Sequence, residues 1–222
     1  MSQRKLLRVT AGLVAALALA AAYALAGGDA KKDPPAKDPS AEAKQAAASG
    51  KADPAREMEA YLAMMRPGKE HAALKRMVGE FDVDVEMVMQ PGAPPTRSKG
   101  KEKAALIMGG RYLHGDYTGD MMGTPFHGAG LTGYDTYKKK YFSAWIDDMS
   151  TGIIMGEGTA SADGKVITMK GEFDDPMAGA RMKYRWVTTF VSDDQYTFDW
   201  FQSDKDGKNE FRMMHNTYTR AK

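Results

Sequence analysis

The chain of 222 residues carries 31 lysines and arginines against 29 aspartates and glutamates, a balance that favours neither a nucleic-acid nor an anionic-membrane partner. It has no cysteine, which excludes disulfides, thiolate metal sites, cysteine nucleophiles and an N-terminal lipid-anchored cysteine. The 17 methionines are unusual, and the 23 glycines suit a β protein with many turns.

Residues 1–26 are typical of a signal peptide. A basic start precedes an apolar run rich in alanine and leucine, and small residues follow at 24–26, where a signal peptidase cuts. The alternative is an uncleaved membrane anchor, but the run is short for a spanning helix of about 20 residues. In both cases we expect the rest of the chain to be extracytoplasmic, either periplasmic or secreted. If the signal is cleaved, we expect no membrane span in what remains.

Residues 27–55 are rich in Pro, Ala, Lys, Asp and Ser and contain no large apolar side chain. Such a segment cannot bury enough surface to offset its ordering entropy. We therefore expect a disordered linker.

Residues 56–78 predict a helical lead-in. Apolar residues recur at spacings of three and four from Met58 to Met65, Pro67-Gly68 interrupts the pattern, and a second short helix ends before Gly79. We expect these helices to form a lid or plug against one end of the domain that follows.

Residues 79–221 change to a period of two, which indicates β-strands. In the second of them Lys99, Lys101 and Lys103 are expected to face outward. The expected strands lie at about 81–89, 97–108, 111–121, 125–135, 140–148, 151–160, 166–173, 181–190, 196–200 and 210–219. Hairpin-length connections favour an all-β, antiparallel up-and-down barrel of about eight to ten strands over a sandwich.

Several motifs resemble a bacterial family known as domain of unknown function 1579, over about residues 70–221. The resemblance is carried by 123–130 (GTPFHGAG), 133–135 (GYD) and 145–152 (WIDDMSTG), among others; Phe81 stands where tryptophan is expected. The family is similar to calycin-type barrels, the group of lipocalins and fatty-acid-binding proteins. The resemblance thus implies a lipocalin-like fold, and it implies no established activity and no catalytic residues.

An aromatic set on the later strands could line an apolar pocket, or it could simply fill the barrel. Its members are Trp145, Tyr184, Trp186, Tyr196, Phe198 and Trp200. His215 shares its alternation with Phe211 and Met213, so an inward imidazole could ligate haem iron or a metal. The favoured alternative is a histidine hydrogen-bonded to a neighbouring tyrosine or threonine.

No metal site and no nucleophile is predicted. The other histidines are isolated, neighbouring carboxylates of a strand point to opposite faces, and the methionine pairs lack a copper-binding repeat. The leading hypothesis is a binding barrel for a small apolar or amphipathic ligand, with the cofactor and the oligomeric state unknown. A solid-core structural or protein-interaction domain is the alternative; an enzyme acting at the barrel mouth through His127, Asp135 and Asp147 is disfavoured.

Overall fold

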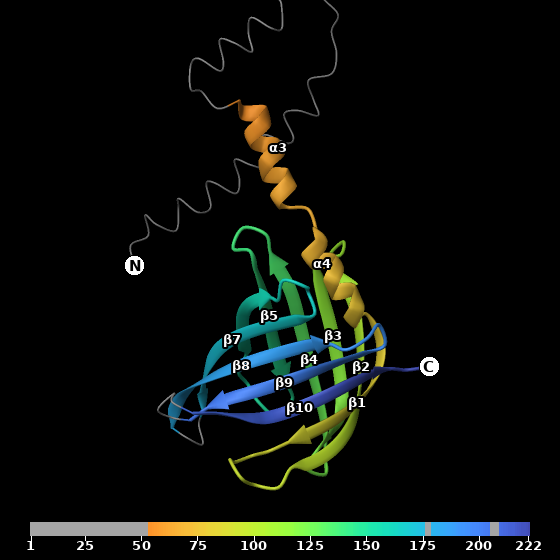
Figure 1. Cartoon of the computed structure of the whole chain (residues 1–222), viewed down its shortest axis with the longest axis vertical. Helices are drawn as coiled ribbons and strands as arrows, with labels where there is room; N and C mark the ends of the chain where they lie inside the picture. The colour runs from red at the N-terminus through yellow and green to blue at the C-terminus, as the bar shows by residue number, and fades with distance from the viewer. Residues whose placement is uncertain (1–52, 176–178, 205–208) are drawn as a thin grey trace, which may run out of the picture. The chain divides into compact units, whose positions relative to one another are not determined.

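The computed structural model describes residues 53–175, 179–204 and 209–222 (Figure 1). The predicted signal peptide at 1–26 and nearly all of the predicted linker at 27–55 lie outside these residues and stay predictions. Within the described part, none of the helices combines the length and the apolar character that crossing a membrane requires.

Ten strands of the described residues form a closed antiparallel barrel, which confirms the predicted all-β fold at the upper end of its strand number. Each strand pairs with the next along the chain, and β1 pairs with β10 to close the ring (Figure 1). The strands are β1 (Gly79–Met87), β2 (Thr96–Ile107), β3 (Tyr112–Met121), β4 (Thr124–Asp135), β5 (Lys140–Asp147), β6 (Ile154–Ala160), β7 (Val166–Asp175), β8 (Ala180–Phe190), β9 (Gln195–Ser203) and β10 (Glu210–Arg220).

Alternation along each strand separates an apolar inside from a charged outside. In β1, Phe81 and Val83 are each 1% exposed. The residues that alternate with them carry carboxylates that pair with the lysines of β2 across the outer face: Lys99–Asp84 at 2.7 Å, Lys101–Asp82 at 3.0 Å and Lys103–Glu80 at 3.1 Å. These exposed pairs contribute little stability, but they agree with the register that turns the other face of β2 inward.

The helical lead-in covers one end of the barrel with only part of its length. It comprises α3 (Pro54–Met64), α4 (Lys69–Ala73) and the 3-10 helix η1 (Leu74–Met77). His71, Leu74 and Met77 are buried, so α4 and η1 form the expected plug at what we call the helix end. The expectation is wrong for α3, which buries no residue and so takes no part in the plug.

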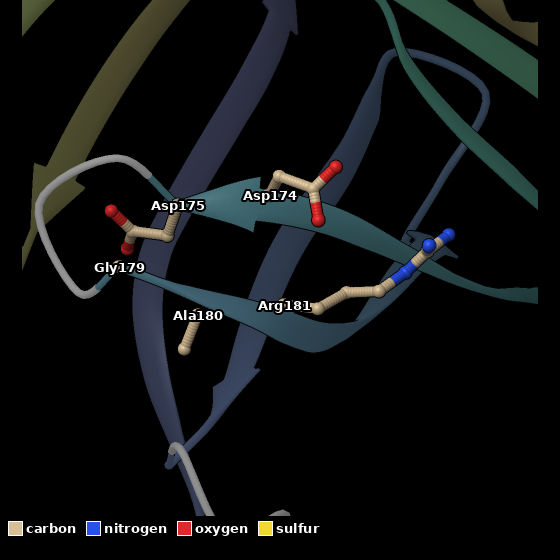
Figure 2. Close-up of a pocket in the computed structure, with 5 residues that line it drawn as sticks. All are labelled: Asp174, Asp175, Gly179, Ala180 and Arg181. Atoms are coloured by element: carbon tan, nitrogen blue, oxygen red, sulfur yellow. The ribbon is translucent and has the colours of Figure 1, made fainter.

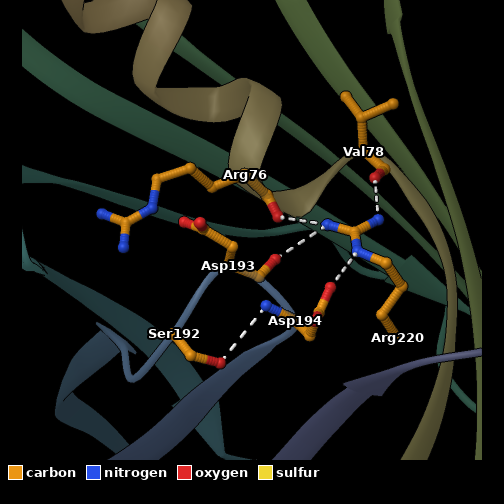
Figure 3. A network of polar contacts seen from close by, with 6 residues as sticks. All are labelled: Arg76, Val78, Ser192, Asp193, Asp194 and Arg220. Carbon is orange, nitrogen blue, oxygen red and sulfur yellow. Dashed lines mark hydrogen bonds and ion pairs between the residues drawn. The ribbon is translucent and has the colours of Figure 1, made fainter.

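Arg220 fastens the helix end (Figure 3). Its Nη1 donates to the carbonyl oxygen of Val78 at 2.7 Å, its Nη2 to that of Arg76 at 3.2 Å, and its Nε to Oδ1 of Asp194 at 3.2 Å. The guanidinium also lies 4.7 Å from the centre of the Phe81 ring. One side chain of β10 thus joins the lead-in, β1 and the β8–β9 turn.

Candidate functional site

The barrel interior is lined by rings from the predicted aromatic set. Cross-strand pairing places Trp145, Tyr184, Trp186, Phe198 and Trp200 on inward positions. The rings of Trp186 and Trp200 meet edge to face with centroids 5.6 Å apart, and Tyr184 lies 4.7 Å from Trp186. Trp186 is fully buried, whereas Trp145, Phe198 and Trp200 are only half-buried.

Inward glycines allow these rings to lie against the barrel wall. A Cβ atom built on Gly128 would sit 2.2 Å from the Trp145 ring, and one on Gly171 would sit 2.2 Å from the Tyr184 hydroxyl. No side chain other than hydrogen fits at such a distance, since carbon atoms pack at about 3.5–4.0 Å. Gly128 therefore leaves the space on the inner wall that the Trp145 ring occupies.

Trp145 and Tyr184, two rings of the inner wall, have their polar atoms paired within the protein. The Trp145 Nε1–H donates to Oδ2 of Asp147 at 3.0 Å, and the Tyr184 hydroxyl donates to the carbonyl oxygen of Met155 at 2.6 Å. These bonds fix both side chains in place and assign them a structural role.

Three other inward polar atoms are buried and have no hydrogen-bond partner among the described protein atoms. They are Nε1 of Trp186, Nε1 of Trp200 and Oδ1 of Asn216. The amide nitrogen of Asn216 does donate, to the Tyr218 hydroxyl at 3.3 Å. Since buried polar groups in proteins are nearly always paired, each of these atoms calls for a partner that the protein does not supply.

Glu102 adds a carboxyl group to this interior. It lies opposite Phe81 of β1 and Tyr117 of β3, on an inward position of β2. Burial raises the pKa of Glu102 to about 7, with a smaller push from the charge of Asp116, while the hydrogen bond from the Tyr196 hydroxyl at 3.4 Å acts the other way. The carboxyl is therefore poised between its neutral and ionised forms near neutral pH.

Three tyrosines surround this carboxyl as neutral groups. Burial is the main cause that raises the pKa of Tyr117, Tyr196 and Tyr218, and the charge of Glu102 adds to it in each case. The Tyr196 and Tyr218 rings stack at 4.3 Å. Because Tyr196 bonds to Glu102 and Tyr218 to Asn216, these four residues form one polar strip across the inner wall.

Sequence reasoning missed Glu102 and Asn216, although a signal for Glu102 was present. The outward lysines at 99, 101 and 103 place residue 102 on the opposite, inward face of the same strand. A carboxylate at a core position is rare enough to draw attention.

The expectation that His215 points inward is wrong. The register between β9 and β10 shifts between Arg212 and Met214, so an extra residue reverses the alternation that starts at Phe211. His215 therefore lies on the outer face, with Nδ1 2.7 Å from Oδ1 of Asp199 and Nε2 3.4 Å from the Thr217 hydroxyl. It is not positioned to hold a ligand inside the barrel.

The residues named for an enzyme at the barrel mouth do not form one site. His127 faces outward and its Nε2 lies 3.1 Å from Oδ2 of Asp116, whereas Asp147 faces inward on the next strand. Asp135, at the far end of β4, accepts hydrogen bonds from backbone amides of its own turn. In the described ranges, no group of three or more histidines and carboxylates is arranged to hold a metal ion.

Two hollows among the described residues lie at the surface of the barrel. Figure 2 shows the residues that line one of them, at the ends of β7 and β8. This hollow measures about 340 Å³, and Arg181 beside it is ion-paired with Glu172 at 2.9 Å. The other, of about 210 Å³, lies over β1 to β3; Glu102 borders it, but most of its lining, including Lys101 and Lys103, faces outward.

The chain is similar to several solved structures, one of which, with a TM-score above 0.5, has a similar fold. The Rv2717c protein from M. tuberculosis is 13% identical, with 71% of this chain and 100% of that one covered and a TM-score of 0.51. An S-type phycobiliprotein lyase, CPES from Guillardia theta, is 13% identical; the match covers 71% of this chain and 94% of that one, with a TM-score of 0.48. A redesigned β barrel is 18% identical; the match covers 68% of this chain and 96% of that one, with a TM-score of 0.35.

No curated protein matches the chain. A family model, described as protein of unknown function (DUF1579), matches residues 66–220, which agrees with the resemblance seen in the motifs and with the lipocalin-like barrel that it implied. The chain therefore belongs to the DUF1579 family.

Proposed function

We propose that this protein is an exported binding protein that holds a small amphipathic ligand inside its barrel. The observation that carries the proposal is the set of three buried, unpartnered polar atoms on Trp186, Trp200 and Asn216. Leaving a buried donor or acceptor unpaired costs about 1–3 kcal/mol. A ligand that pairs with these atoms removes that cost when it binds.

The surroundings of these atoms define the rest of the ligand. Aromatic faces make up much of the inner wall, so the body of the ligand is apolar, and the few polar atoms select its polar group. We infer that the ligand enters at the end opposite the helices, because α4 and η1 plug the other end with buried side chains.

Export is the part of the proposal that rests on the N-terminal sequence alone. Intact-mass measurement of the protein recovered from its own host tests it directly. A mass that lacks about the first 26 residues, in the extracytoplasmic fraction, supports export. The full-length mass in the cytoplasmic fraction overturns it.

Native mass spectrometry of the same preparation tests ligand binding. We expect a reproducible added mass that is released on unfolding. The variants Trp186→Phe and Trp200→Phe keep an aromatic ring and remove the N–H donor, so we expect each to retain less ligand. Phe201→Leu is the matched control, because Phe201 lies on the outer face under Arg185, 4.0 Å from its guanidinium carbon.

A filled core that serves as a structural or protein-interaction domain is the second candidate. It is favoured by the two hollows, which lie mainly on the outer surface, and by the half-exposed apolar side chains of Met58, Tyr61 and Leu62 on α3. A bare polypeptide mass, together with failure to bind any apolar fluorescent probe, would decide for this candidate.

A further inference from the structure

We infer that the polar group of the ligand is a protonated amine held by Glu102, so that the barrel selects cationic amphiphiles. This inference rests on the proposed function and narrows it to one class of ligand. It follows from the signs of the charges inside the barrel, from the hydrogen-bonding capacity of Glu102 and from the acceptors beside it.

The inward positions of the described strands offer a ligand carboxylates and no free cation. Glu102 lies at mid-height, and every lysine of these strands faces outward. Among the arginines of the described strands, only Arg220 stands at an inward position of its strand. Its guanidinium is already hydrogen-bonded to protein groups at the helix end. A fatty-acid carboxylate would therefore meet a carboxylate and no positive partner, which is unfavourable in a buried site.

Glu102 has unused capacity to accept hydrogen bonds. Its side chain lies against Gly115, where an added Cβ would be 2.9 Å from Oε1, so it follows the inner wall. Its one hydrogen bond among the described side chains, from Tyr196, is long at 3.4 Å. An ionised carboxylate has about four acceptor sites, so several remain for a ligand.

A second acceptor lies on the same polar strip. Oδ1 of Asn216 is buried and unpartnered, and Asn216 is linked to Glu102 through Tyr218 and Tyr196. An ammonium group carries three N–H donors and no acceptor. It can bond to the Glu102 carboxylate, and the Asn216 carbonyl oxygen is a second acceptor further along the same strip for other donors of the ligand. The tyrosine ring faces add cation–π attraction.

Displacement of a neutral fluorescent probe, N-phenyl-1-naphthylamine, from the mature full-length protein tests the selection. Dodecylamine, dodecanol and dodecanoate share one chain length and differ in their polar group. At pH 8 we expect dodecylamine to bind about tenfold more tightly than dodecanol, because a charge-assisted hydrogen bond is about twice as strong as a neutral one. Dodecanoate is expected to bind most weakly.

Glu102→Gln should abolish the preference for the amine, so that dodecylamine and dodecanol displace the probe with similar affinities. Glu80→Gln is the matched control, since Glu80 carries the same group on the outer face of the neighbouring strand, paired with Lys103. If dodecanol displaces the probe but dodecylamine binds no better, the inference is overturned while the proposed function stands. If neither the probe nor any of the three ligands binds, the proposed function itself fails.

The pH dependence provides a second readout that needs no variant. Groups facing Glu102 are Tyr117, Tyr196 and Tyr218, which stay neutral over this range, and Asp116 behind it, which contacts His127. With the pKa of Glu102 at about 7, the ionised fraction rises about tenfold from pH 6 to pH 8. The affinity for dodecylamine should rise by a similar factor between pH 6 and pH 8. The variant His127→Gln should show the same rise, because His127 is not the group that titrates in this test. An affinity that does not change with pH would contradict the role of Glu102.

Discussion

Replacement of Gly128 by alanine tests the arrangement of rings on the inner wall. The new methyl carbon would lie 2.2 Å from one carbon of the Trp145 ring and within 3.0 Å of two others, so the ring must leave its place. Overpacking of this kind costs about 1–3 kcal/mol. A displaced ring also loses its hydrogen bond to Asp147, worth about 1 kcal/mol or more, and its stacking on Phe126. We expect a total of about 2–4 kcal/mol.

Urea unfolding followed by circular dichroism measures this loss, and Gly130→Ala is its control. Gly130 lies two residues further along the same strand under the same ring, but its added Cβ would be 3.5 Å from Trp145, an ordinary contact. We expect Gly130→Ala to change stability by less than about 0.5 kcal/mol. Equal stability of the two variants would show that the Trp145 ring does not lie over Gly128.

Three further predictions concern stability. The pKa of Glu102 is about 7 in the folded protein against 4.5 in the unfolded chain, so the folded protein binds this proton more tightly. Proton binding at Glu102 therefore stabilises the fold fully below pH 4.5. This stabilisation, up to about 3 kcal/mol, is lost as the pH rises through 7. Urea unfolding from pH 5 to pH 8 should show it, and Glu102→Gln should remove it. Trp200→Phe should lower the free energy of unfolding by about 1–3 kcal/mol less than Trp145→Phe does, because only the Trp145 N–H loses a hydrogen-bond partner. Equal losses of stability in thermal unfolding would show that the Trp200 N–H is not unpaired. Arg220→Leu should lower the free energy of unfolding by about 2 kcal/mol, since three backbone carbonyl oxygens lose their donor. Arg212→Leu, which removes one ion pair of the outer face, should have little effect in the same assay.

The sequence predicted the barrel because its strands alternate clearly. In β8 the inward Tyr184 and Trp186 alternate with outward Lys183 and Arg185, and the period alone orients them. The same rule failed at His215 because one inserted residue at 213 reverses every later side chain of β10, and no turn residue or glycine announces it. A register shift of this kind depends on pairing with β9, which local sequence does not contain.

The polar strip of the interior was harder to predict for a different reason. Glu102 and Asn216 lie on strands that are far apart in sequence, and they are linked only because the barrel closes. Their unusual properties, a raised pKa and an unpaired carbonyl oxygen, arise from the side chains packed around them. Periodicity assigns a residue to a face but does not say which distant residues share its surroundings.

The pairing of β1 with β10 has a consequence for how the protein folds. It joins residues such as Phe81 and Arg220, at opposite ends of the domain, so the last strand must be synthesised before the first can complete its hydrogen bonds. Until then β1 offers an open edge to other chains, a known route to aggregation. Contacts of such large sequence separation form slowly. We expect barrel closure to limit the folding rate, with the chain depending on its final eleven-residue strand for protection from self-association.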